Sequence, residues 1–183
     1  MALLFSLLII GGEAVTIYWQ MTHKPDPKYF ATSSDGRIMP LYALDQPNLS
    51  KAAVLQWSNK AAVAAYTYNF VNYRAAFQRA SRYFTSNGCN QFMTPIEGSN
   101  NLQAVKAKKL VVSAVAAGAP IILQQGVISG RFAWKVQLPL LVSYLSASQQ
   151  IQQSLLVTML ISRVPTLNDP EGIGIDQFVA QAS

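Results

Sequence analysis

Residues 55–74 read LQWSNKAAVAAYTYNFVNYR, and this stretch decides the fold because its apolar residues recur at helical spacing on two opposite faces. At about 100° per residue, one face carries Trp57, Ala61, Ala64, Tyr68, Val71 and Ala75. The other carries Val63, Tyr66, Phe70, Tyr73, Phe77 and, further on, Phe84. A helix that is apolar on both sides is normally buried. One face therefore covers its own domain's core, and the other is covered by another segment or another protein.

The sequence around this stretch predicts helices first and a sheet afterwards. We expect a long helix over residues 51–79, with Ser50 as its N-cap, a break at residues 86–88, and short helices around 90–94 and 102–108. After Lys109 the pattern alternates, which predicts strands over 110–116, 121–128, 131–145 and 151–164, with a short edge element at 175–179. Short connections favour antiparallel neighbours. The predicted fold class is α+β, with a long helix packed on a curved four-stranded antiparallel sheet.

The first residues predict a membrane anchor. Residues 2–21 are mostly apolar, have the length that spans a bilayer, and end with the interfacial aromatics Tyr18 and Trp19. Glu13 interrupts them at a cost of about 2.5–3.5 kcal/mol; its carboxyl group either contacts a polar group of a neighbouring membrane helix or stays protonated or snorkels without a partner. A cleavable signal peptide competes, but no basic region precedes the apolar run, so we favour the anchor.

The predicted domain organisation has three parts. Residues 1–22 are the transmembrane anchor, residues 23–49 are a linker with two extended pieces at 29–32 and 38–44, and residues 50–183 are the α+β assembly domain. The prolines at 25 and 27 favour a stiff linker.

Composition excludes several function classes. The 183 residues carry a net charge of +6 with a pI of about 9.6, yet only 12% are charged and the cations are scattered, so we expect no direct nucleic-acid binding. The tightest group, Lys106, Lys108 and Lys109, is either a solvated helix end or a contact for phosphate or an acidic partner. No Asp or Glu lies between Gln46 and Ile96 or between Gly98 and Asn168, and the chain has one His and one Cys. We therefore expect no catalytic residues, no metal site and no cofactor.

Further strings resemble a known family in their order and spacing: KYFAT at residues 28–32, DGRIMPL at 35–41, DQPNLS at 45–50, AVKAKKLVVSAVA at 104–116 and GRFAWKVQLPLLVSY at 130–144. The chain resembles the DotI/IcmL family and its conjugation relative TraM, inner-membrane subunits of type IVB secretion machines. The resemblance implies a cystatin-like or nuclear-transport-factor-like periplasmic domain on a single-pass anchor in the bacterial inner membrane. Charge alone places the domain in the cytoplasm, but that rule is weak for long domains.

The resemblance also implies a function. We expect a non-enzymatic scaffold that forms a higher oligomer, binds a DotJ/IcmM-like subunit, and helps to pass effector proteins or DNA as cargo. Its expected interface residues are Tyr66, Phe70, Tyr73 and Phe77, unless residues 29–44 fold over that face. The alternative is a membrane-anchored periplasmic module that binds an apolar small ligand in the cone between helix and sheet, lined by Trp57, Phe70, Trp134 and Tyr144.

Overall fold

The computed structural model describes residues 12–19, 21–22, 29–32, 38–41, 43–97 and 100–182, with the backbone alone at 29–32, 38–41 and 97. The chain divides into two units, Met1–Leu41 and Tyr42–Ser183. In the first unit, residues 12–19 and 21–22 are helical, and β1 (Tyr29–Thr32) pairs antiparallel with β2 (Ile38–Leu41). The first expected extended piece is thus confirmed as a strand, and the second is confirmed over residues 38–41, whereas residues 43–44 are not in a strand. The sequence also predicts that residues 29–44 cover one face of the following helix. Residues 29–41 and that helix belong to different units, so this cover stays a prediction.

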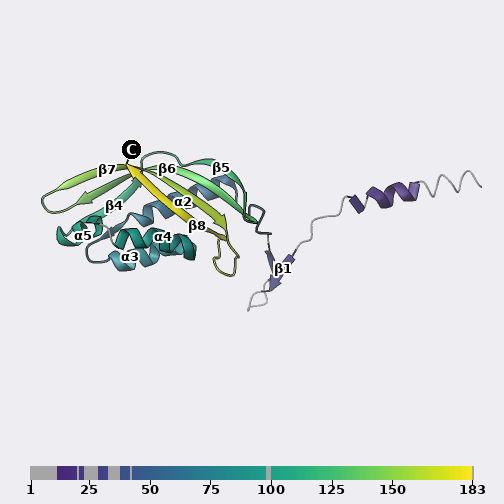
Figure 1. The fold of residues 1–183 in the computed structure, drawn as a ribbon, viewed down its shortest axis with the longest axis horizontal. Helices are drawn as coiled ribbons and strands as arrows, with labels where there is room; N and C mark the ends of the chain where they lie inside the picture. The colour runs from purple at the N-terminus through teal and green to yellow at the C-terminus, as the bar shows by residue number, and fades with distance from the viewer. Residues whose placement is uncertain are drawn as a thin grey trace, which may run out of the picture. The chain divides into compact units, whose positions relative to one another are not determined.

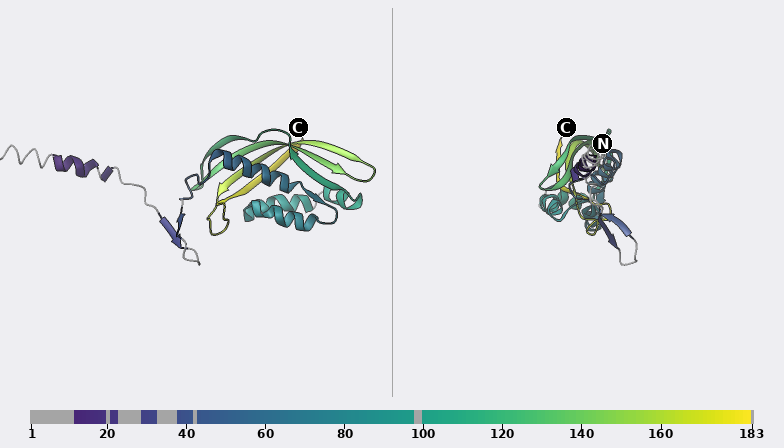
Figure 2. Two further views of the ribbon diagram at one scale, coloured as in Figure 1. Left: turned by 180° about the vertical axis from the view of Figure 1, so that it is seen from behind. Right: turned by 90° about the vertical axis from the view of Figure 1, so that its right-hand side faces the viewer.

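The second unit is a layer of helices on one face of a curved antiparallel sheet (Figures 1 and 2). Its helices are α2 (Lys51–Ala65), α3 (Tyr73–Ala80), α4 (Ser86–Glu97) and α5 (Asn100–Ala107), with the 3₁₀ turn η1 (Ser81–Tyr83). Its strands are β3 (Tyr68–Asn69), β4 (Val111–Ala116), β5 (Ile121–Ile128), β6 (Arg131–Leu145), β7 (Gln150–Arg163) and β8 (Ile173–Ala182). The α+β class and the four predicted strands are confirmed.

The prediction of a four-stranded sheet is wrong, because the sheet has six strands. The main path is β3-β4-β6-β7-β8, and β5 pairs with β6 beside β4. The expected short element at residues 175–179 is the ten-residue strand β8, which pairs with β7 from Leu155 to Arg163. Outside the expected element, Gly174, Ala180 and Ala182 have weak strand preference, so pairing with the long neighbour β7 extends the strand.

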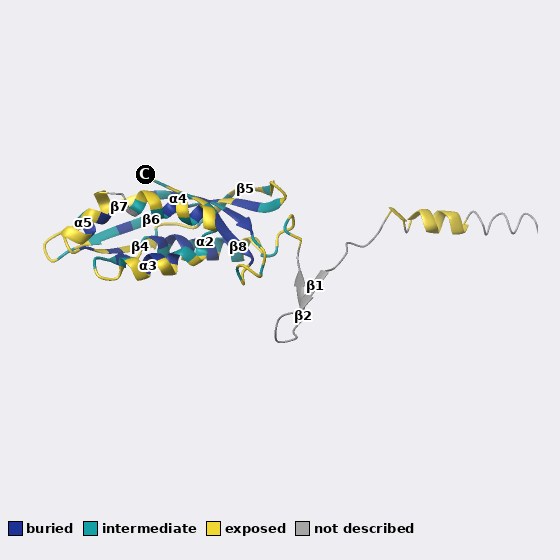
Figure 3. Ribbon diagram, turned by 60° about the horizontal axis from the view of Figure 1, so that its bottom comes forward, coloured by how far each residue is buried: buried dark blue, intermediate teal, exposed yellow. Residues whose placement is uncertain are grey.

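The core lies between α2 and the inner face of the sheet. Figure 3 shows buried positions in dark blue on the sheet and on the sides of the helices that face it. Alternate β6 residues are almost completely buried, as the alternation predicted: Trp134, Val136, Leu138, Leu140 and Val142. From α2, Val54 and Trp57 meet this face together with small alanines that let the helix approach closely. Ser50 Oγ accepts a hydrogen bond from Ala53 N at 3.2 Å, which confirms the predicted N-cap.

The predicted long helix over residues 51–79 is also wrong, because α2 ends at Ala65. Asn69 Oδ1 accepts from Val71 N at 2.9 Å and Asn72 N at 2.8 Å, while Asn72 Oδ1 accepts from Asn69 N at 3.0 Å. Asparagine side chains that bond to nearby backbone compete with helical hydrogen bonds. The chain turns there, and β3 pairs with β4. The sequence therefore keeps a helical periodicity through a segment whose hydrogen bonds are those of a turn.

The expected break at residues 86–88 is wrong as well, because these residues begin α4. Thr85 Oγ1 accepts a hydrogen bond from Gly88 N at 3.1 Å, as an N-cap does. Thr85 N in turn donates to Ile175 O at 3.0 Å, so the start of α4 is fixed against β8. A Cβ atom at Gly88 would collide with the carbonyl oxygen of Ile175. Glycine is required here by the close approach of helix and strand.

Three tyrosines gather where α2 ends and the sheet begins. Burial and the nearby Tyr144 phenol raise the pKa of Tyr66 to about 12. The same causes, with Tyr66 added, raise the pKa of Tyr68 still further, and burial raises that of Tyr144. Tyr68 is 6% exposed and its ring lies 4.8 Å from that of Phe77. The cluster closes this end of the core while its hydroxyl groups remain protonated.

Gly88→Ala is expected to destabilise the domain by about 1–3 kcal/mol, because the added methyl group forces α4 away from β8. Gly126→Ala is the matched control: Gly126 lies in β5 with no atom within 4 Å of an added Cβ. Urea unfolding at pH 7 measures both. Equal midpoints for the two variants would contradict the close packing at Gly88.

The tyrosine cluster predicts a loss of stability at alkaline pH. An unfolded tyrosine titrates near 10, so above that pH the unfolded chain releases protons that the folded chain retains. The contribution of these tyrosines to the free energy of unfolding is then constant below about pH 10 and falls towards pH 12, by at most about 1.4 kcal/mol per pH unit for each such tyrosine. Tyr66→Phe should flatten this decline in urea unfolding measured from pH 8 to 11.5. The same slope in the variant and the natural chain would show that Tyr66 does not contribute.

Candidate functional site

The structure does not place the four expected interface residues on one exposed stripe. Phe77 is 3% exposed and belongs to the core, so its side chain has no surface to offer a partner. Tyr66 is partly buried with its ring 6.2 Å from that of Phe178 in β8. Phe70 and Tyr73 are half-buried at the edge of the core. A partner contact through Tyr66, Phe70 and Tyr73 stays a prediction.

Tyr73 borders a groove between α3, α4 and α5, which we call the helix groove. Its volume is about 570 Å³. The residues that line it are Tyr73, Arg74, Phe77, Gln78, Ser81, Cys89, Met93, Leu102, Gln103 and Lys106. Phe77 and Leu102 are almost completely buried, so the half-buried Tyr73 and Met93 supply the apolar part of the lining that a partner can reach. The groove thus offers an apolar contact surface on the outside of the helix layer.

Two cations border the helix groove. Arg74 Cζ lies 5.6 Å and Lys106 Nζ lies 5.8 Å from the centre of the Tyr73 ring, within the range of cation–π attraction. The sequence between Gln46 and Asn168 holds one acidic residue, Glu97. The groove therefore suits an apolar side chain that is accompanied by negative charge. Burial raises the pKa of the Cys89 thiol, which disfavours the thiolate and so a nucleophilic role for this groove residue.

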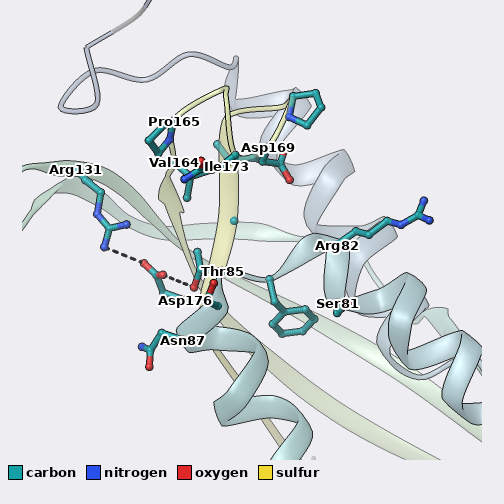
Figure 4. Close-up of a pocket in the computed structure, with 15 residues that line it drawn as sticks. Ser81, Arg82, Thr85, Asn87, Arg131, Val164, Pro165, Asp169, Ile173 and Asp176 are labelled. Atoms are coloured by element: carbon teal, nitrogen blue, oxygen red, sulfur yellow. Dashed lines mark hydrogen bonds and ion pairs between the residues drawn. The ribbon is translucent and has the colours of Figure 1, made fainter.

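A second cavity, of about 750 Å³, lies where α4 meets β8 (Figure 4). Its polar contacts join three elements. Thr85 Oγ1 donates to Asp176 Oδ1 at 2.8 Å, and Asp176 Oδ2 lies 4.0 Å from Arg131 Nη2. Asp176 also places a negative charge near the start of α4, where the helix dipole favours it. These groups hold β6, β8 and α4 together, and this explains their arrangement without a ligand.

Arg163 fixes the connection between β7 and β8. It is 1% exposed; its Nε donates to Gln46 O at 3.1 Å and its Nη1 donates to Gly172 O at 2.7 Å. Burial lowers the pKa of this guanidinium group. Asn48 Nδ2 adds a bond to Glu171 O at 2.8 Å. The side chains of Arg163 and Asn48 leave no room for a Cβ at Gly172, whose φ is +68°. The segment that enters the domain and the β7–β8 connection are thereby held as one piece.

The described residues form a groove and a cavity at the surface of the domain. Within the described ranges, no three His, Cys, Asp or Glu residues lie close enough to hold a metal ion. The helix groove was not predicted, because the periodicity of residues 51–79 indicated one long helix in place of α2 and α3. The β7–β8 connection was not predicted as a functional segment either, although Asp169 and Glu171 there are acidic residues at the end of a long stretch with almost none.

Glu13 lies in the first unit, in the helical residues 12–19, and its side chain is exposed. Its carbonyl oxygen accepts a hydrogen bond from Thr16 Oγ1 at 2.8 Å. Within the described residues, no helix combines the length and the apolar character that a membrane crossing requires. A contact of Glu13 inside the membrane stays a prediction.

Comparisons with known proteins give the family. The periplasmic domain of DotI is 61% identical, with a TM-score of 0.73 over 75% of this chain and 99% of that one. A periplasmic fragment of TraM is 25% identical, with a TM-score of 0.68 over 73% and 98% of the two chains. An IcmL-like type IV secretion system protein from Legionella pneumophila, 20% identical, shares the fold with a TM-score of 0.67 over 75% and 96%. No curated protein matches the chain in sequence.

The family model for the inner-membrane complex component DotI/IcmL of the type IVb secretion system matches residues 3–182. The match covers nearly the whole chain and agrees with the fold, in which helices cover one face of a curved antiparallel sheet. This chain therefore belongs to the DotI/IcmL family of inner-membrane components of type IVb secretion systems.

Proposed function

We propose that this protein is a non-enzymatic structural subunit of the inner-membrane complex of a type IVb secretion or conjugation apparatus. In this proposal the domain of residues 50–183 lies in the periplasm, on a single-pass anchor formed by residues 1–22. It oligomerises and binds other subunits there. The observation that supports this best is the 61% identity to the DotI periplasmic domain over 99% of that domain's length.

The proposed partners are further copies of this chain and a shorter DotJ/IcmM-like subunit. Effector proteins or DNA pass through the apparatus as cargo. The helix layer supports a protein-binding role because its groove combines apolar residues with the cations Arg74 and Lys106. Its basic residues are spread over several elements and do not form the continuous stripe that tracks a phosphate backbone.

The ligand-binding alternative receives less support from the interior. Trp57 is 6% and Trp134 is 1% exposed, and both pack in the core cluster between α2 and the sheet. The expected cone is occupied there by the protein's own side chains. The helix groove and the cavity beside Asp176 both lie at the surface of the domain.

The scaffold proposal predicts a large particle. The full chain, expressed in membranes and solubilised in mild detergent, should have a mass several times that of one copy. Co-expression with the neighbouring secretion genes should add those subunits to the particle. Light scattering coupled to size exclusion measures the mass. A monomer in both preparations, with thermal stability that rises on adding an apolar ligand, would contradict the scaffold and support the alternative.

Phe70→Asp should weaken self-association at least tenfold while the domain stays folded, because a carboxylate replaces a half-buried aromatic ring of the proposed interface. Val71→Asp is the matched control, since Val71 is the next residue and is 75% exposed. Sedimentation velocity gives the association and circular dichroism the fold. Should Phe70→Asp unfold the domain, Phe70 belongs to the core and the proposed contact there is lost.

A further inference from the structure

The connection between β7 and β8 presents an exposed apolar side chain. Leu167 is 81% exposed, the highest value among the large apolar residues that the structure describes. It lies in the Pro165–Gly172 loop, whose sequence is PTLNDPEG. Burying a leucine side chain is worth about 1.5–3 kcal/mol. Such a residue at the tip of a loop is a candidate anchor for a contact with another protein.

The Pro165–Gly172 loop is held in one conformation by its own hydrogen bonds. Asn168 N donates to Pro165 O at 2.9 Å, and Gly172 N donates to Asp169 O at 2.9 Å. Asp169 Oδ1 accepts from Glu171 N at 2.8 Å. At the base of the loop, Arg163 binds Gly172 O, as described above. A loop that is already ordered loses little conformational entropy when it binds, so Leu167 is presented at low cost.

The loop also carries the charge that the helix layer lacks. Between residues 46 and 168 the acidic residue is Glu97, whereas the loop adds Asp169 and Glu171 within a few residues of Leu167. Glu171 is exposed. In the described part of the structure, neither Glu171 nor the groove residues Arg74 and Lys106 take part in an ion pair. A leucine flanked by carboxylates matches a groove with apolar lining and cations at its edge.

The Pro165–Gly172 loop does not line the helix groove of its own copy, although Ser81 borders both the groove and the cavity that the loop lines. The lining of the groove contains no residue of the Pro165–Gly172 loop. Figure 1 shows α5, which forms one wall of the groove, and the β7–β8 connection towards opposite ends of the same domain. Both lie in the unit Tyr42–Ser183. Two complementary but different surfaces on one chain join copies head to tail, which produces a ring if the rotation closes.

We infer that the Pro165–Gly172 loop of one copy places Leu167 in the helix groove of a second copy, with Glu171 facing Arg74 or Lys106. This inference rests on the proposed self-association and names the surfaces that carry it. Each copy uses its loop towards one neighbour and its groove towards the other. The occupant of the groove is therefore a second copy of this chain.

A disulfide between a cysteine introduced at position 167 and the native Cys89 of a second copy tests this contact. Cys89 lines the groove and is the single cysteine of the chain. Leu167→Cys in the full chain, oxidised in membranes with copper phenanthroline and oxygen as the electron acceptor, should give a ladder of dimers and longer species on a non-reducing gel. Head-to-tail contact gives chains because each copy contributes one thiol to each of two neighbours.

Two controls interpret the ladder. Leu167→Cys combined with Cys89→Ser should abolish every species longer than a dimer, and the natural chain should show no ladder. A ladder that is absent from Leu167→Cys while the particle keeps its mass would overturn the inference and leave the scaffold proposal standing. Cross-linking of the introduced thiol to a different subunit would also overturn it. A monomeric natural chain would contradict the proposed function itself.

Charge reversal gives an independent test. Leu167→Asp should weaken self-association about 10- to 100-fold, and Lys106→Glu and Glu171→Lys should each weaken it about threefold to tenfold. The double variant Lys106→Glu with Glu171→Lys should recover most of the loss. Lys60→Glu, at an exposed position of α2 outside the groove, is the matched control. Sedimentation velocity measures association, and thermal unfolding checks that each variant folds. Failure of the double variant to recover would place Glu171 away from Lys106 and overturn that pairing.

Discussion

Strand β6 must be paired on both edges and shielded from water on one face, and the rest of the domain follows from this requirement. On one edge it pairs with β7 along residues 133–145. On the other edge it pairs with β4 through residues 140–145 and with β5 through residues 131–137. Pro139, which has no N–H to donate, lies where this edge passes from one partner to the other, and its carbonyl oxygen accepts from Ala117 N at 2.9 Å. A proline is tolerated inside a central strand because the change of partner requires no donor there.

The inner face of β6 then determines what the helices must do. Trp134 and its alternate neighbours leave a long apolar surface that α2 covers along its length. α4 packs on β8 through Gly88, where a larger residue has no room. With α4 held on β8, the helix groove lies between α3, α4 and α5. The surface that we propose for assembly is thus a consequence of how the core is covered.

Much of the fold is predictable from the sequence, and the parts that are not have physical reasons. Alternation along residues 131–145 predicts β6 because every second side chain must be apolar to face the core. The end of α2 is not predictable from periodicity, since Tyr66, Phe70 and Tyr73 keep helical spacing while Asn69 and Asn72 bond to the backbone of a turn. A groove between helices depends on their relative placement, which no local pattern encodes. Phe77 was therefore predicted at an interface, although it packs in the core.

The distribution of charge favours one arrangement for the proposed contact between copies. Cations on the helix layer repel one another in every pair of copies, so two helix layers brought face to face would be unfavourable. Asp169 and Glu171 of the Pro165–Gly172 loop border a surface hollow together with Arg79 and Arg82, at the end of the domain opposite α5. Approach of a loop to a helix layer is the orientation in which opposite charges meet. The same distribution that disfavours a symmetric pair thus favours a head-to-tail arrangement, in which one contact leaves a free loop and a free groove for the next copy.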